Sequence, residues 1–290
     1  MKPKYEEIAN QVIQDWYIDK GNLNERICGI DRFLKLLPRR EAKFIHQERL
    51  ISKIDTKPDD PEQISIDSAH GLIKIPEFNT DKEVFLRDLK TEIDDAIRAV
   101  GEQVLDGMFK EIDNRITKDS HHFEMSKNDK FCDTLRKASA QSNVKDKKIA
   151  VVNPLTENYI AEEAFFSLST ERQSEILKQK EEDNKKHGSI GIDDYTIKTD
   201  GGNLDVIPSA FCPLDTMFVL NKKDLEIQYL SEDDKDFVFF KEYEEGVFVT
   251  KSFDEAGFEA RLEFYGSLII KEPAIHERIT LHSSKVPVLE

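Results

Sequence analysis

The stretch TDKEVFLRDLKTEIDDAIRAVGEQVLDGMFKEIDNRI, residues 80–116, carries the strongest local signal in the chain. Residues Thr80 to Glu83 have the pattern of a capping box, in which an N-terminal hydroxyl and a later glutamate satisfy the first turn of a helix. Apolar residues then recur every three or four positions, which predicts one continuous helix of about 35 residues. The series consists of Leu86, Leu89, Ile93, Ile97, Val100, Val104, Met108, Ile112 and Ile116.

A helix of that length is about three times the usual one. Gly101 and Gly107 lie inside it, and each glycine disfavours the helix by roughly 1 kcal/mol relative to alanine. Packing against other elements must therefore hold the helix. A coiled-coil partner is the competing interpretation, but the apolar series drifts as a 3.6-residue period does and lacks steady heptads.

The second decisive stretch is FEARLEFYGSLII, residues 258–270, which alternates without a break between apolar and polar positions. This pattern predicts a strand of about 43 Å, at 3.3 Å per residue, which is long enough to lie beside the helix. We expect the core to be one long helix packed on one long sheet. Six shorter strand-like segments precede it: IDDYTIKT, NLDVIP, TMFVLN, LEIQYL, FVFFKEY and VFVTKSF.

The rest of the chain is mixed. Residues 5–37 predict two short amphipathic helices, and residues 44–76 predict a projecting hairpin with a tight turn at Ser68 to Gly71. FCDTLRKASAQ predicts a short helix and KIAVVNP a buried strand. A helix is then expected from Thr156 to Gly188, and its last turns are charged and fully solvated.

The composition excludes several classes of protein. Lys and Arg number 42 and Asp and Glu 58, so the net charge is −16. Such a charge argues against a nucleic-acid binder whose affinity comes from counterion release. The three cysteines, Cys28, Cys132 and Cys212, are far apart and predict packed thiols in a reducing compartment, not disulfides or a metal site. No signal peptide or membrane-spanning run is expected, so the chain is predicted to be made in the cytoplasm.

No constellation for catalysis stands out. The spacings that build phosphate loops, nucleophile elbows and zinc helices are missing from the sequence. We therefore predict a protein that is not an enzyme, with no catalytic, cofactor-binding or metal-binding residues and no cofactor. The residues weighed and set aside are Asp193, Asp194, Asp200 and Asp205 for calcium, His121, His122, His187, His276 and His282 for a transition metal, and Asp67, Ser68 and His70 for a triad.

Four stretches, together with the order of elements, resemble the tailed-bacteriophage major capsid proteins with the Hong-Kong-97-type fold. KIAVVNP is similar to the strand that opens the axial domain of that family, and HGSIGIDDYTIKTDGG to its passage from a helix end through glycine to a strand. IPSAFCPLDTMFVLNKKDLEI resembles its strand and proline turn, and FYGSLIIKEPAIHERITL its closing strand. The likeness covers roughly residues 80–282.

The resemblance implies an α+β fold with five parts. They are an N-terminal arm at 1–43, an extended β-hairpin loop at 44–78, a peripheral domain with the spine helix at 79–146, a mixed α/β axial domain at 147–224, and the long strands of the peripheral domain with a C-terminal strand at 225–290.

The implied function is that of a structural subunit that self-assembles into the icosahedral head around the DNA genome of a tailed phage. The implied partners are further copies of the chain, in hexamers and pentamers, with scaffold, portal and decoration proteins as further candidates. Packaged DNA would be a neighbour only by proximity, and no membrane is involved. The implied location is the virion, after synthesis in the host cytoplasm. An encapsulin-like shell around an enzyme cargo, a cytoplasmic hydrolase using acidic residues, and another virion or adaptor protein remain as alternatives.

Overall fold

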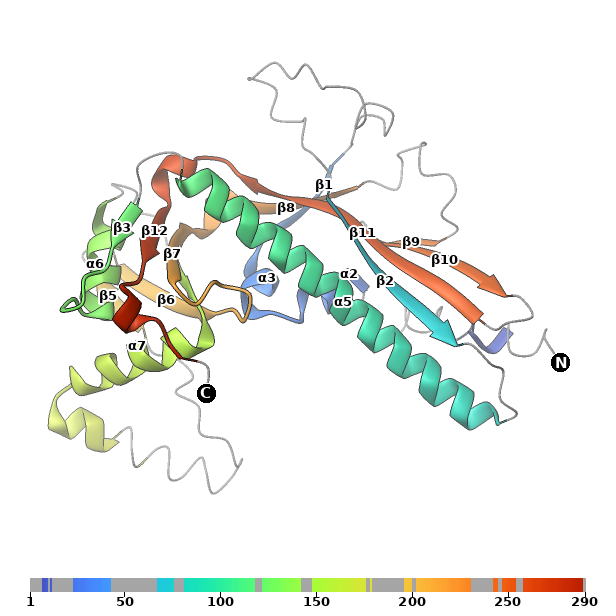
Figure 1. The fold of residues 1–290 in the computed structure, drawn as a ribbon, viewed down its shortest axis with the longest axis horizontal. Coiled ribbons are helices and arrows are strands. Elements are labelled where there is room, and N and C mark those ends of the chain that lie inside the picture. Colours follow the sequence, from blue (N-terminus) through green and yellow to red (C-terminus); the bar gives the residue numbers. More distant parts are fainter. Residues whose placement is uncertain are drawn as a thin grey trace, which may run out of the picture. The chain divides into compact units, whose positions relative to one another are not determined.

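The computed structural model describes residues 7–9, 11, 23–42, 67–75, 81–117, 122–141, 148–175, 178, 196–199, 202–230, 242–244, 247–253 and 258–288. The chain divides into two compact units, and Figure 1 traces its elements. Unit 1 comprises Met1–Glu111 and Leu225–Ile269, and unit 2 comprises Ile112–Asp224 and Ile270–Glu290. Each unit is thus built from two separate stretches of sequence.

In the part of unit 1 that the structure describes, a six-stranded sheet is accompanied by the helices α2, α3 and α5. The sheet has the order β1-β8-β11-β10-β9, with β2 also paired to β11. Strand β2 is antiparallel to β11, whereas β1 is parallel to β8. The elements are α2 (Leu23–Cys28), α3 (Arg32–Leu36), β1 (Arg39–Ala42), β2 (Asp67–Ile75), α5 (Lys82–Thr117, within this unit as far as Glu111), β8 (Leu225–Leu230), β9 (Glu242–Glu244), β10 (Val247–Phe253) and β11 (Phe258–Ile270).

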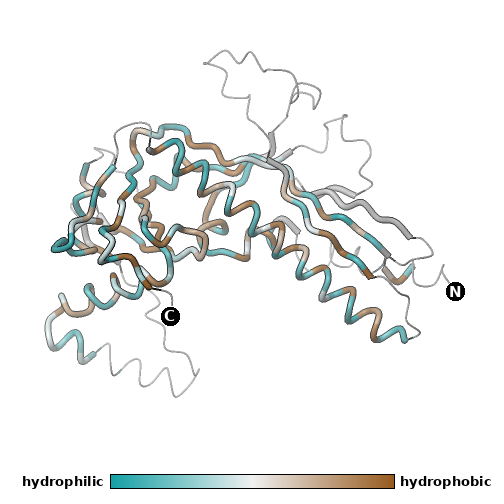
Figure 2. The backbone as a smooth tube through the Cα atoms, in the orientation of Figure 1, coloured by the Kyte–Doolittle hydropathy of each residue, from teal (hydrophilic) through white to brown (hydrophobic). Residues whose placement is uncertain are grey.

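The long helix predicted from the sequence is confirmed as α5, with 36 residues. Its cap is Asp81 and not the hydroxyl of the predicted capping box: the Oδ1 of Asp81 accepts a hydrogen bond of 2.9 Å from the backbone N–H of Glu83, and Thr80 lies outside the described residues. Brown and teal alternate along α5 in Figure 2, as expected for a helix with one apolar face. That face is wider than the predicted series, because Phe85, Leu105 and Phe109 are also buried.

The predicted strand at 258–270 is confirmed as β11, and its alternation sets its two faces. Ala260, Leu262, Phe264, Gly266, Leu268 and Ile270 are buried along one face.

The tight turn predicted at Ser68 to Gly71 is wrong. These residues belong to β2, which pairs with β11 without interruption from Asp67 to Ile75. Gly71 is needed for close approach and not for a turn, since a Cβ on it would lie 2.5 Å from the backbone oxygen of Ala96 in α5. The predicted projecting hairpin is therefore wrong for residues 67–75, and the remainder of that prediction, 44–66, falls outside the described residues.

The helix predicted to end before Pro38 is interrupted. It forms two pieces, α2 and α3, because Asp31 acts as an N-cap in the middle: its Oδ1 accepts hydrogen bonds from the backbone N–H groups of Phe33 and Leu34. The two pieces pack on α5. The rings of Phe33 and Phe109 have centroids 5.6 Å apart, and Arg26 forms an ion pair with Asp94. These elements of the same chain occupy the surface that a coiled-coil partner would need.

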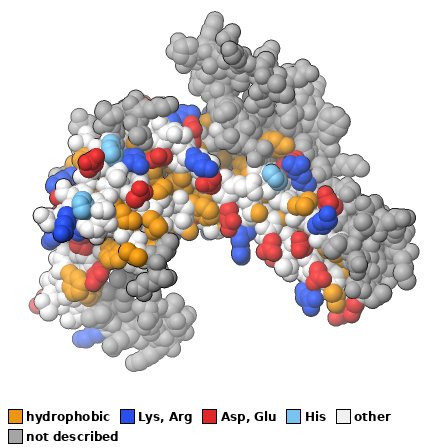
Figure 3. All heavy atoms as spheres, in the orientation of Figure 1, with side chains coloured by type: hydrophobic (Ala, Val, Ile, Leu, Met, Phe, Trp, Pro, Cys, Tyr) orange, Lys and Arg blue, Asp and Glu red, His pale blue; other side chains and the backbone are white. Residues whose placement is uncertain are grey.

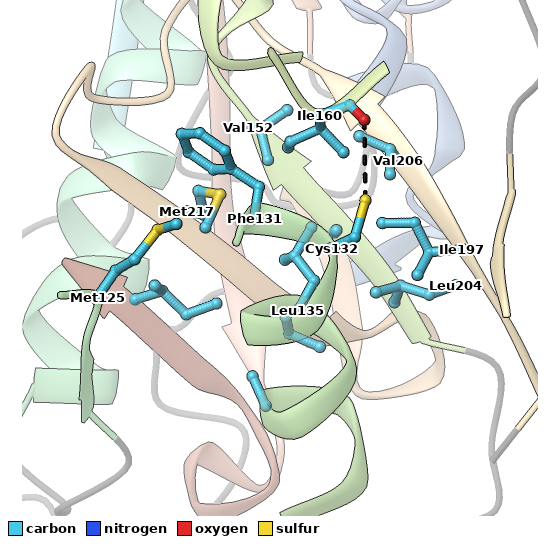
Figure 4. Packing of buried hydrophobic residues seen from close by; sticks show 14 of the residues in the cluster. Met125, Phe131, Cys132, Leu135, Val152, Ile160, Ile197, Leu204, Val206 and Met217 are labelled. Atoms are coloured by element: carbon cyan, nitrogen blue, oxygen red, sulfur yellow. Dashed lines mark hydrogen bonds between the residues drawn. The ribbon is translucent and has the colours of Figure 1, made fainter. Parts of the chain in front are cut away.

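Unit 2 is a second six-stranded sheet, with the order β3-β12-β7-β4-β6-β5. The predicted buried strand is confirmed as β4, which has no exposed residue and lies between β7 and β6. Figure 4 shows side chains of its core, among them Leu135 and Met217. The elements are β3 (His122–Glu124), α6 (Phe131–Gln141), β4 (Lys148–Val152), α7 (Pro154–Phe166), β5 (Thr196–Thr199), β6 (Gly202–Pro208), β7 (Thr216–Asn221), β12 (Glu277–Thr280) and the short 3-10 helices η1 (Lys222–Asp224), η3 (Pro273–Ile275) and η4 (Ser283–Lys285).

The helix predicted from Thr156 to Gly188 has different bounds. Helix α7 begins at Pro154, with Asn153 as its cap, and ends at Phe166. Residues 167–169 interrupt it, and residues 170–175 form a further helical segment. Gly188, the predicted stop, lies outside the described residues. A solvated polar run carries helical propensity but no buried face, so the sequence pattern could not locate this break.

Candidate functional surfaces

The three thiols are packed, as predicted. Cys28, Cys132 and Cys212 are all buried, and none of them forms a disulfide. Burial, and next the negative charge of Glu163, raise the pKa of Cys132 to about 11, and its Sγ donates a hydrogen bond to the backbone oxygen of Ile160, as Figure 4 shows. Such a thiol stays protonated at neutral pH and is a poor nucleophile.

The histidines of the described residues take part in structural hydrogen bonds. His122 on β3 lies 2.6 Å from the Oγ1 of Thr280 and 3.2 Å from an Nη1 of Arg278, and Arg278 in turn donates from Nε to Asp113. This network joins the last turns of α5 to β12 and β3 within unit 2. His276 accepts a hydrogen bond from the backbone N–H of Asn221.

The other residues weighed from the sequence are not brought together by the described structure. His282 caps the 3-10 helix η4, and His70 lies on β2, where its backbone is bonded to Gln103. Asp205 lies on β6 opposite Ile149. Over the described ranges, no group of three or more His, Cys, Asp or Glu side chains is placed to hold a metal ion, and no helix is long and apolar enough to cross a membrane. The remaining candidates, His121, His187, Asp193, Asp194 and Asp200, lie outside those ranges, as do the side chains of Asp67 and Ser68.

Unit 2 also contains a buried pair of charged side chains that the sequence did not indicate. Lys148 on β4 and Glu277 on β12 are both buried. Lys148 donates from Nζ to the backbone oxygen of Ser139. Burial lowers the pKa of Lys148, and the charge of Glu277 opposes that shift. Because both side chains are buried, Lys148 and Glu277 can position strands, but they are not accessible to a substrate in solvent.

A group of exposed apolar side chains in unit 2 lies on and just after α7. Phe166 is 65% exposed and Tyr159 is 49% exposed, and Leu168 follows directly after the helix end with 39%. The ring of Tyr159 stacks on Phe131 at a centroid distance of 6.2 Å, so one of its faces is held by the core. Neighbouring exposed apolar side chains on one helix are typical of a surface that contacts another protein. The sequence pattern predicted only a polar helix over this region and did not indicate these exposed apolar side chains.

Unit 1 contains a small groove between α5 and the sheet. It encloses about 70 Å³. This volume is well below the roughly 300–1,000 Å³ of pockets that bind small molecules and cofactors, so we do not interpret it as a cofactor site. The lining residues are Ala69, Gln103, Val104, Gly107, Met108, Glu111, Ile227, Phe264, Gly266, Ser267 and Leu268.

Charge is mixed over the surface. On the face shown in Figure 3, acidic and basic side chains alternate with hydrophobic ones and form no extended basic patch. The net charge of −16 and the mixed charges of the described part of this face both disfavour binding to phosphate groups.

Comparison with protein families gives one match. The model of the family described as "SU10 major capsid protein" matches residues 90–245, a stretch that includes elements of both units. No curated protein sequence matches the chain.

Solved structures give a likeness of fold. The virus-like particle from Pyrococcus furiosus has 10% sequence identity and a TM-score of 0.50, and the alignment covers 91% of this chain and 99% of that one. The procapsid of satellite phage P4, solved with its size determination protein, has 9% identity and a TM-score of 0.50, with 90% of each chain covered. At this identity the likeness concerns the fold alone.

Proposed function

This chain belongs to the SU10 major capsid protein family, and on that basis we propose that its copies form the hexamers and pentamers of a closed shell and catalyse no reaction. It is a structural subunit of the capsid of a tailed bacteriophage, with the α+β Hong-Kong-97-type fold. The resemblance stated from the sequence is thus confirmed. The single observation that carries the conclusion is the family match, which covers more than half of the chain.

We assign the parts of the chain as the resemblance implied. The arm is residues 1–43, the peripheral domain 79–146 with 225–290, and the axial domain 147–224. The extended loop, implied as 44–78, is proposed only for 44–66, because residues 67–75 form β2 in the sheet of unit 1. A helix as long as α5 supports a role as a spine, because its two ends belong to different units of the chain. Strand β4 and helix α7 support a separate mixed lobe in the middle of the sequence.

The partners follow from the same role. Other copies of the chain are the main partner, and scaffold, portal and decoration proteins are candidates that would act during or after assembly. The genome would lie near the wall without specific contacts, since a subunit with a net charge of −16 repels phosphate. We also propose that the chain is synthesised in the host cytoplasm and then incorporated into the virion.

Two alternatives considered from the sequence are less well supported. An encapsulin-like shell would use the same fold around an enzyme, but the matching family is one of major capsid proteins. A hydrolase using acidic residues would be a catalytic protein, whereas the matching family is one of structural capsid proteins.

The test is to express and purify the full chain and examine it by size-exclusion chromatography and electron microscopy. We expect closed hollow shells or flat sheets of hexagons, and a compact monomer under all assembly conditions would overturn the proposal. Shells isolated from infected cells that contain a single enzyme and no DNA would instead establish the encapsulin-like alternative.

A further inference from the structure

Strand β2 has an outer edge that could pair with a further strand. Among the described strands, β2 pairs only with β11, and Figure 1 shows it between β11 and α5. In an antiparallel pair, the backbone groups of alternate residues point to opposite sides of the strand. His70 and Lys74 use their backbone N–H groups to bond α5, so the even-numbered residues of β2 direct their N–H and C=O groups away from β11. Such a row of groups is a template for strand addition.

Gln103 of α5 occupies the place of the next strand at this edge. Its Oε1 accepts a hydrogen bond of 3.2 Å from the backbone N–H of His70, and its Nε2 donates one of 2.8 Å to the backbone C=O of the same residue. A residue of a neighbouring antiparallel strand would make the same two bonds. Glu92 adds a longer contact of 3.5 Å, in which its Oε2 accepts from the backbone N–H of Lys74. Gln103 therefore gives His70 both of the bonds that a further strand would offer.

Leu72 lies between these two contacts and makes the edge favourable for pairing. Its side chain is 49% exposed, whereas Gly71 and Ile73 beside it are buried. The stretch AHGLIKI, residues 69–75, carries one formal charge, at Lys74, and no proline. Strands of low charge without proline that show an apolar side chain at an edge pair readily between chains. A second strand at this edge would cover Leu72 together with the backbone groups.

We infer that Gln103 blocks the outer edge of β2 and so prevents a second copy of this chain from pairing there strand to strand. The excluded occupant is a second β2, because every copy presents the same edge and two identical strands can pair antiparallel with Leu72 near the centre. That arrangement would bury the two Leu72 side chains against each other. The inference concerns an association that the fold avoids, and it does not rest on the proposed function.

Removing both hydrogen bonds of Gln103 tests the inference. Gln103→Leu keeps the length of the side chain and a good helix former, but it can neither accept nor donate a hydrogen bond. Light scattering of the full chain, after any shells are removed by centrifugation, should show dimers and larger species at a concentration about tenfold lower than for the wild type. The matched control is Thr91→Ala on the same helix, whose hydroxyl bonds the backbone oxygen of Arg87 and not β2. It should associate as the wild type does.

Two further measurements establish whether β2 is the contact. Amide hydrogen exchange over residues 67–75 of Gln103→Leu should slow when the chains associate, because the outward N–H groups then bond a second strand. Adding Leu72→Lys to Gln103→Leu should restore the association of the wild type, because paired strands would bring two like charges together. A hydrogen bond that only ties α5 to β2 would produce neither result.

Each outcome decides the inference. Association of Gln103→Leu equal to that of the wild type overturns it, even if the variant is less stable, since Gln103 would then only tie α5 to β2. Stronger association that leaves exchange in β2 unchanged, or that Leu72→Lys does not reverse, also overturns it. If Gln103→Leu fails to fold, Gln103→Glu is measured in the same way. Its carboxylate keeps the bond from the N–H of His70 and loses the one to the C=O, so the same outcomes apply to a smaller increase in association.

Discussion

The hydrophobic cores of the two units are packed in different ways. Unit 2 closes a core of ordinary side chains around β4, with α6 and α7 contributing residues such as Leu135 and Ile160. Unit 1 packs one long helix on one sheet, and there the fit depends on residues without side chains, such as Gly71. The first kind of core tolerates little loss of volume, while the second tolerates little gain. The difference shows that unit 1 depends on a close approach between β2 and α5, which glycine at position 71 permits.

The largest effect is expected from removing volume in unit 2. Leu135 is fully buried, so Leu135→Ala should lower the free energy of unfolding by about 4 kcal/mol through lost burial and the cavity left behind. Native-state hydrogen exchange should show lost protection of the β4 amides with little change in β11. The exposed Lys137→Ala on the same helix is the control. Equal loss of protection in both strands would mean that the two units unfold as one and would break the comparison.

A gain of volume in unit 1 should be almost as harmful. Gly71→Ala places a methyl group against the backbone of Ala96, which cannot move aside as a side chain can. We expect a loss of about 3 kcal/mol, measured by denaturant unfolding of the unassembled subunit. A variant as stable as the wild type would show that the spacing of β2 and α5 is not set by this glycine.

Alkaline pH should destabilise the two units over different pH ranges. The pKa of Cys132 in unit 2 is raised from 9.0 to about 11, so the folded state keeps a proton that the unfolded state releases. Stability should therefore fall as pH rises from 9 to 11, by up to about 3 kcal/mol at roughly 1.4 kcal/mol per pH unit. Cys132→Ser should remove this slope, and an unchanged slope would contradict the assignment.

In unit 1 the corresponding group is Tyr265, which loses its proton at a higher pH than Cys132. Burial, followed by the charge and hydrogen bond of Glu263, raises its pKa from 10.0 to about 12. The folded state again holds the proton longer, so its contribution to stability is lost only above pH 10. Hydrogen exchange in unit 1 should consequently respond to pH about one unit later than in unit 2.

The smallest effect should be a gain in stability. The methyl group of Gly107→Ala meets no heavy atom of the described residues within 4 Å and improves helix propensity, so the unassembled subunit should become more stable by about 1 kcal/mol. Thermal unfolding measures this change, and Gly101→Ala is the matched control because the side chain of Ile30 and the backbone oxygen of Ile27 crowd that position. A loss of stability at Gly107 would mean that the groove is occupied within the subunit.

Long periodic segments could be predicted from the sequence. The apolar series of α5 and the alternation of β11 are local patterns that tertiary contacts only reinforce, whereas the cap of α5 is Asp81 and not the predicted Thr80. The turn predicted at Ser68 to Gly71 failed because a glycine beside polar residues has the same local pattern whether it turns the chain or lets Ala96 approach. That distinction depends on a residue 25 positions away.

The surfaces could not be predicted in the same way. The exposure of Tyr159 and Phe166 depends on which face of α7 the sheet covers, and the sequence of that helix shows no clear period. Gly107 could be recognised as a weak point of the helix, but the groove around it involves Phe264 and Leu268 from the far end of the chain. The prediction that no catalytic site exists stays a prediction.

The central claim, that this chain is a self-assembling shell subunit, is tested most directly by the mass of the purified full chain under assembly conditions. Light scattering after size-exclusion chromatography should give a narrow species with a mass many times the 33.5 kDa of one chain, and electron microscopy of that fraction should show closed shells. A homogeneous species of one or two chains that does not grow with concentration or salt would contradict the account.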